Sequence, residues 1–158
     1  MSSTMEVLRE IKDNELNYII SRLEKDLPYA IKDLQFILSS KRSKKLSNVF
    51  TDITGKILPT FYVPRDGIKD NCTIFAITSD HETIWYFTYQ ESLNEVRNCL
   101  ENTNLIKWTK TVMFVTIHQK HSEIIFEYVR KKNYKIQHIE TCFYYYLPKK
   151  LAKQIKVP

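Results

Sequence analysis

Glycine is the residue that this sequence most conspicuously lacks. The chain has 158 residues but only two glycines, Gly55 and Gly67, where average usage would give about 11. A loop that holds the phosphates of CoA or a nucleotide needs several glycines, because the backbone must approach the phosphate and present its N–H groups at a helix start. Neither glycine lies in such a pattern, so the sequence excludes a glycine-rich phosphate loop within this chain.

Paired cysteines and long apolar runs are also missing. The three cysteines, Cys72, Cys99 and Cys142, form no CxxC pair, and an odd, sparse set indicates reduced thiols in a reducing compartment. Each lies in an apolar, periodic setting, where a thiol usually behaves as a small hydrophobe. No apolar run approaches the roughly 20 residues that cross a bilayer, and the N-terminus lacks the apolar core of a secretory signal. We therefore expect an intracellular protein, cytoplasmic in the first instance, with no membrane partner.

The formal charge is +6 at pH 7, with basic clusters at residues 41–45, 130–132 and 149–156. A basic balance can indicate a nucleic-acid partner. Acidic residues are interleaved through most of the chain, however, and no RNA-recognition octapeptide, zinc finger or GXXG loop is present. We expect a solvated basic surface, and keep a basic module that binds nucleic acid or an acidic protein as an alternative.

The hydrophobic periodicity predicts helices that alternate with strands. Apolar residues spaced by three and four predict a helix over 5–27 and a short second helix from Pro28 to Leu34. A helical turn or two is predicted over 46–53, and further helices over 91–101, 105–108 and 121–132. Strands are predicted at 35–39, 60–63, 72–78, 83–89, 111–117 and 134–147, with 79–82 as a hairpin loop. This order predicts an α+β domain over residues 1–150, with a single mixed β-sheet and helices packed on it, before a basic tail at 151–158.

The histidines do not suggest a metal site. His118 and His121 are three residues apart and would share one face of a helix, with Glu123 nearby. Zinc needs three or four convergent ligands, and no cysteine joins these residues at a suitable spacing. We therefore predict no metal, and a strand-to-helix loop with exposed imidazoles.

Several short motifs resemble one family. They are Leu23-x-x-x-Leu27-Pro28 with Ile31-Lys32, then Phe61-Tyr-Val-Pro64 with Arg65-Asp66, then Ser92–Leu100 with Leu105-Ile-Lys-Trp108, and the closing aromatic strand with Leu147-Pro148. Over residues 16 to 150 the chain resembles the N-terminal half of glycine N-acyltransferase-like proteins, which belong to the GNAT superfamily.

The resemblance implies a GNAT-like fold and different roles for the two halves of the full-length protein. Members of that family resemble two GNAT-like halves in tandem and transfer an acyl group from acyl-CoA to an amine such as glycine. Their C-terminal half holds the catalytic groups and the acyl-CoA pyrophosphate loop, of the form Gln/Arg-x-x-Gly-x-Gly/Ala. This chain lacks such a loop, so the resemblance implies a module that is non-catalytic alone and partners a catalytic C-terminal half or a second copy. The resemblance also implies the mitochondrion as a second candidate compartment, beside the cytoplasm.

An alternative is a complete small acyltransferase with a degenerate phosphate loop. Residues 117–123 lie between a predicted strand and a predicted helix, where GNAT enzymes put their loop. His118 and Lys120 are then the candidates for binding the phosphates of acyl-CoA, helped by the helix N-terminus. His121 or Glu123 is the candidate general base that would activate glycine or another amine.

Overall fold

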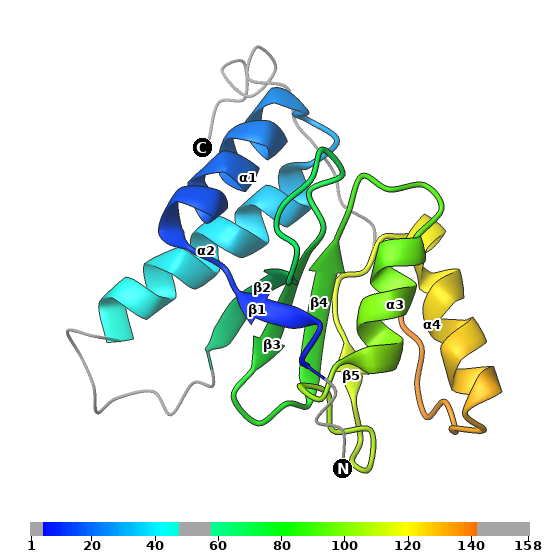
Figure 1. Ribbon diagram of the computed structural model, residues 1–158. Coiled ribbons are helices and arrows are strands. Elements are labelled where there is room, and N and C mark those ends of the chain that lie inside the picture. Colours follow the sequence, from blue (N-terminus) through cyan, green and yellow to red (C-terminus); the bar gives the residue numbers. More distant parts are fainter. Residues whose placement is uncertain (1–4, 48–57, 142–158) are drawn as a thin grey trace, which may run out of the picture.

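The computed structural model describes residues 5–47 and 58–141 (Figure 1). The elements in chain order are β1 (Leu8–Glu10), α1 (Asp13–Lys25), α2 (Ile31–Ser47), β2 (Pro59–Pro64), β3 (Ile74–Thr78), β4 (Thr83–Phe87), α3 (Asn94–Asn102), β5 (Met113–Phe114) and α4 (Gln119–Lys131). The strands form one sheet in sequence order, antiparallel from β1 to β4, while β4 and β5 are parallel. The predicted α+β class with a single mixed sheet is therefore confirmed.

The sheet is covered on both faces, and the central strands are apolar on both sides as a result. Because side chains alternate along a strand, Trp85 and Phe87 of β4 lie in the core under α1 and α2. Ile84 and Tyr86 of the same strand lie in the core under α3 and α4. Figure 1 shows these two helix pairs on opposite sides of the sheet. The architecture is thus three layers, with two helices on each side.

The N-terminal helix begins later than its apolar spacing predicts. Residues 8–10 form a strand that pairs antiparallel with β2, with Leu8 opposite Pro64. Helix α1 starts at Asp13, where the Glu15 carboxylate accepts a hydrogen bond of 2.9 Å from the Lys12 backbone nitrogen and caps the first turn. The prediction of a helix from residue 5 is therefore wrong for residues 5–12, because three strand residues are too few to show a period of two.

Residues 35–39 were predicted as a strand but belong to α2. The stretch is a short apolar run, which periodicity alone cannot assign to a strand or a buried helix. In the structure Leu34 and Ile37 are buried, while Leu38 is 42% exposed, as expected for a helix with one face on the sheet. Phe36 stacks on Trp85 with ring centroids 4.7 Å apart, which ties α2 to the central strand.

The middle of the chain agrees with the prediction. Strands β2, β3 and β4 coincide with the predicted strands, and the antiparallel pairing of β3 with β4 confirms the hairpin at 79–82. Helices α3 and α4 lie within three residues of the predicted bounds. Cys99 is buried on α3, as predicted.

Other expectations are corrected. Residues 105–108 form a bend and the start of a turn rather than a helix, and residues 134–141 contain no strand. Cys72 is buried but precedes β3, in a left-handed backbone conformation with φ of 47°. The predicted strand at 111–117 shrinks to β5, whose Met113 is 55% exposed, so it is not buried on both faces. Residues 142–147 of the last predicted strand and 48–53 of the predicted helical turn lie outside the described residues.

None of the described helices is both long and apolar enough to span a bilayer.

Burial along α1 leads to a first prediction. Leu23 is fully buried under the helix pair, and the neighbouring Glu24 is exposed. We expect Leu23→Ala to lower the free energy of unfolding by about 2–5 kcal/mol, because it leaves a cavity in the core. Glu24→Ala is the matched control and should change it by less than about 0.5 kcal/mol. Urea denaturation followed by circular dichroism measures both, and equal effects would contradict the described orientation of α1.

Candidate functional site

The junction between β5 and α4 contains all four residues predicted to carry chemistry. His118 is the residue that caps α4, and its Nδ1 accepts a hydrogen bond of 3.2 Å from the backbone nitrogen of Lys120. Burial lowers the pKa of His118, and the positive charges of Lys32 and Lys120 lower it further. One of the helix N–H groups that a phosphate would need is thus satisfied by the protein itself.

His121 is buried rather than exposed, which corrects the prediction for this loop. Its side chain belongs to a residue that is only 4% exposed, and its ring lies over Tyr86 with centroids 6.4 Å apart. Burial, together with the charges of Lys120, His118 and Lys32, lowers the pKa of His121 to about 4. The imidazole is therefore neutral at pH 7 but is a weak base, well below the pKa that suits a general base.

Glu123 lies on the outer face of α4. Its carboxylate accepts a hydrogen bond of 2.6 Å from Arg130, and both side chains are about two-thirds exposed. The structure therefore does not bring Glu123 and the buried His121 together around a reacting group. Within the ranges described, no three His, Cys, Asp or Glu side chains converge as a metal site would require.

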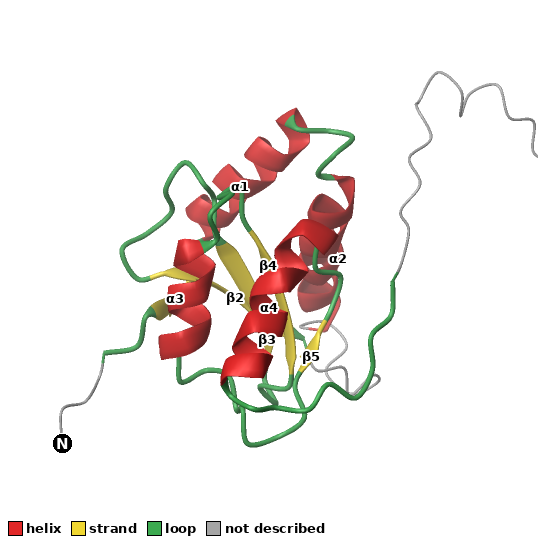
Figure 2. Cartoon of the chain, turned by 90° about the vertical axis from the view of Figure 1, so that its right-hand side faces the viewer, coloured by secondary structure: helices red, strands yellow, loops and turns green. Residues whose placement is uncertain are grey.

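A cleft beside this junction was missed by the sequence analysis. It lies between α2 and the loop after β5 and has a volume of about 560 Å³, within the usual range for small-molecule sites. Figure 2 shows β5 next to the chain that leads into α4. The cleft is lined by Lys32, Gln35, Phe36, Leu38, Ser39, Arg42 and Thr116. The prediction of a strand at 35–39 concealed it, because only a helix places residues 32, 35, 39 and 42 in one row.

Lys32 joins the two walls of the cleft. Its side chain is 13% exposed, and its ammonium group donates a hydrogen bond of 2.7 Å to the Thr116 carbonyl oxygen. The same nitrogen lies 3.4 Å from the Asp33 carboxylate. Burial raises the pKa of Asp33, while the charge and hydrogen bond of Lys32 oppose that rise. Lys32 and Asp33 therefore form a largely buried ion pair at the first turn of α2.

Thr116 holds its carbonyl toward Lys32 through an unusual backbone conformation. Its φ is +50°, a left-handed value that costs a β-branched residue about 1–2 kcal/mol. No pattern in the sequence indicates this contact, since the two residues are 84 positions apart.

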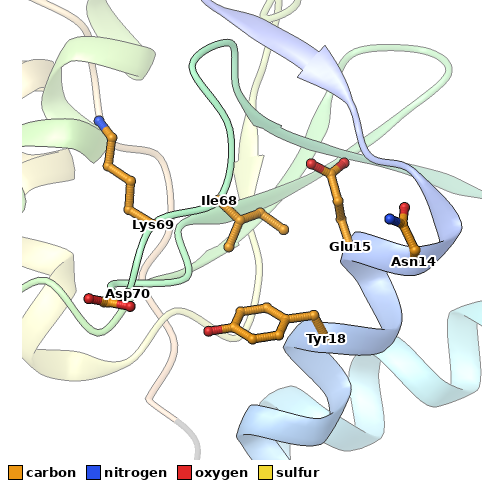
Figure 3. Close-up of a pocket in the computed structure, with 6 residues that line it drawn as sticks. All are labelled: Asn14, Glu15, Tyr18, Ile68, Lys69 and Asp70. Carbon is orange, nitrogen blue, oxygen red and sulfur yellow. The ribbon is translucent and has the colours of Figure 1, made fainter.

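A second hollow, of about 280 Å³, lies between α1 and the loop after β2 (Figure 3). It is lined by Asn14, Glu15, Tyr18, Ile68, Lys69 and Asp70. Two of its charged groups are engaged in ion pairs. Glu15 accepts hydrogen bonds of 2.6 and 2.8 Å from Arg9, and Lys69, whose ammonium points away from Tyr18 in Figure 3, binds Asp66. We therefore interpret this hollow as part of the contact between α1 and the loop after β2, and not as a binding site.

The Glu15 pair predicts a dependence of stability on acid. The Arg9 guanidinium, with the Lys12 backbone, lowers the pKa of Glu15 to about 2 from its ordinary 4.5, although partial burial opposes the shift. The depressed pKa means that the stabilisation is present above pH 4.5 and is lost as the pH falls toward 2. We expect Glu15→Gln, which keeps the helix cap, to cost about 1–2 kcal/mol at pH 7.

Denaturation of both proteins at pH 7 and at pH 2.5 measures this cost. The gap between wild type and variant should shrink on acidification, and a gap independent of pH would contradict the assignment.

His121 predicts a second acid effect with a different window. Its pKa of about 4 in the folded state is lower than the ordinary 6.5. The unfolded chain therefore takes up the proton first, and the folded state loses about 1–3 kcal/mol as the pH falls from 6.5 to 4. His121→Phe, which keeps an apolar ring under Tyr86, should remove this loss.

The measurement is the free energy of unfolding between pH 7 and pH 4.5. His138→Gln, at an exposed histidine, is the control and should follow the wild-type profile. If His121→Phe also followed it, the buried neutral imidazole would be refuted.

Comparison with known proteins gives a family match and a fold match. Residues 7–128 match the model of a family described as a domain of unknown function, DUF5645. The fold is similar to that of a Drosophila protein whose X-ray structure comes from the Northeast Structural Genomics Consortium, with a TM-score of 0.65 and 18% sequence identity. The alignment covers 81% of this chain but 46% of that one, so this chain spans less than half the length of that structure. No curated protein is detectably similar in sequence.

Proposed function

Since the chain belongs to the family described as a domain of unknown function, DUF5645, and shares its fold with less than half of a longer protein, we propose that it is an N-terminal GNAT-like module of a glycine N-acyltransferase-like protein. The observation that carries the proposal is the extent of the structural match. A fold that fills 81% of this chain occupies only 46% of the longer one, which leaves room in the longer protein for a second unit of similar size.

The described junction of β5 and α4 supports a non-catalytic role for this module alone. The candidate phosphate contacts are weakened because His118 itself accepts from the Lys120 N–H. The candidate bases are separated, with His121 buried and Glu123 exposed and paired. The module would act as a scaffold for a catalytic half, and its cleft at α2 would contribute to the acyl-acceptor side.

One observation favours the alternative of a complete small acyltransferase. The first turn of α4 has no acidic residue, and the charges of Lys120 and Lys32 give this helix start a positive environment. Such an end attracts anions. In this alternative Lys120 would contact the phosphates of acyl-CoA, and His121 would have to act as the base despite its low pKa.

Turnover and association distinguish these functions. We expect the purified chain, given acyl-CoA and glycine, to release CoA no faster than a protein-free blank, because it lacks the phosphate loop. We also expect it to bind the separately purified C-terminal half of a glycine N-acyltransferase-like protein, measured by sedimentation velocity, and to change that half's KM for glycine.

Lys120→Ala provides the matched comparison for acyl-CoA. Its affinity for acyl-CoA, measured by calorimetry, should equal that of the unmodified chain. Robust CoA release by the chain alone, abolished by Lys120→Ala, would overturn the proposal in favour of the complete enzyme. Absence of any complex with the C-terminal half would also count against it.

A further inference from the structure

The cleft between α2 and Thr116 is lined by the Lys32 ammonium group, which has more hydrogen-bond donors than its described neighbours accept. An ammonium group has three N–H donors. Lys32 directs one to the Thr116 carbonyl oxygen at 2.7 Å, and the Asp33 carboxylate at 3.4 Å can take a second. The side chain also lines the cleft, so its remaining donor can bond to an acceptor placed in the cleft. A donor that is partly removed from water gains from an acceptor placed there.

The charges that line the cleft have one sign. Lys32 and Arg42 are the charged residues among its lining, with no carboxylate. Arg42 is exposed at the rim, and its guanidinium can form paired hydrogen bonds to a carboxylate or phosphate. Such a one-signed concave surface favours an anion.

The buried Asp33 limits how much negative charge the cleft accepts. Its carboxylate lies 3.4 Å from the Lys32 nitrogen, and the residue is only 5% exposed. It therefore offsets part of the Lys32 charge and repels an incoming anion, a dianion more than a monoanion. A carboxylate, with one negative charge, suits this arrangement better than a phosphate monoester.

The remaining lining contains two large apolar side chains, Phe36 and Leu38, beside the polar Gln35, Ser39 and Thr116. Leu38 is 42% exposed although it is a large hydrophobic side chain, and Phe36, one side of which packs on Trp85, is half-buried. Covering these side chains removes apolar surface from water. A volume of about 560 Å³ leaves room for a hydrocarbon chain beside the charged group.

We propose that this cleft binds a small amphipathic monocarboxylate, with its carboxylate between Lys32 and Arg42 and its hydrocarbon part along Phe36 and Leu38. Binding of this ligand does not require the chain to be an enzyme. If the chain is a module of a glycine N-acyltransferase-like protein, N-acylglycines are the natural members of this ligand class, and that refinement rests on the proposed function.

The test is a calorimetric titration of the full chain with sodium octanoate at pH 7, with backbone amide shifts mapped by NMR. We expect one site, with shifts at residues of α2 and around Thr116. Butanoate and hexanoate should bind more weakly, by about fourfold for each methylene removed that the cleft would bury. Acetate and methyl octanoate, which lack the apolar chain or the charge, should not compete.

Two charge variants and a control separate the site from general electrostatics. Lys32→Met should weaken octanoate at least tenfold, and Arg42→Gln by about three- to tenfold. Lys32→Met leaves the buried Asp33 carboxylate unpaired, which destabilises the fold. Arg42→Gln changes an exposed residue and should fold normally, so it tests the site without this effect. Lys45→Gln, which removes an exposed cation from the same helix outside the cleft, should leave the affinity unchanged.

Several results would overturn the proposal. They are no binding of octanoate, equal losses in Arg42→Gln and Lys45→Gln, affinity independent of chain length, or tighter binding of octyl phosphate than of octanoate. N-hexanoylglycine distinguishes this inference from the proposed function. If it binds no better than octanoate, the carboxylate site stands and the acyltransferase refinement fails.

Discussion

Two consecutive side chains of β4, Trp85 and Tyr86, connect the sheet to both helix layers. Each is 1% exposed, and because they alternate across the strand they enter opposite cores. Trp85 stacks with Phe36 of α2. Tyr86 lies against His121 and donates a hydrogen bond of 2.7 Å to its carbonyl oxygen at the start of α4. The two walls of the cleft, α2 and the entry to α4, therefore take their positions from adjacent residues of one strand.

This arrangement explains how a very short strand can support a site. Strand β5 has two residues, which pair in parallel with Thr83 and Ile84, and it offers little hydrogen bonding of its own. The loop that follows it is held from other directions. The Ile84 carbonyl oxygen accepts from the Val115 nitrogen at 2.9 Å, and Lys32 binds the next carbonyl, that of Thr116. The cleft is thus formed by tertiary contacts around the end of β5 rather than by the sheet ladder.

The sequence predicted the elements whose signal is local and long. Strands β2 to β4 are five or six residues long and rich in β-branched and aromatic residues, and α3 and α4 show clear apolar stripes. The sequence-based prediction failed at β1, because three residues are too few to show the alternation of a strand. It also failed at residues 35–39, where the buried face of α2, with Leu34 and Ile37, gives a short apolar run that resembles a strand. For the site, the sequence placed His118, Lys120, His121 and Glu123 together at the junction of a strand and a helix. It could not show that Tyr86 buries His121, or that Lys32 reaches Thr116, because both contacts join distant parts of the chain.

The scarcity of glycine has a structural counterpart in the described residues. Cys72, His81, Leu93, Thr116 and Asn133 all have positive φ, the region where glycine alone is free of strain. Side chains thus occupy backbone positions at which most proteins use none, and the fold carries that strain in its loops. Mutations at these turns that relieve the strain would raise the stability of the fold. A relative could therefore become more heat-resistant while the packing under both helix layers stays unchanged.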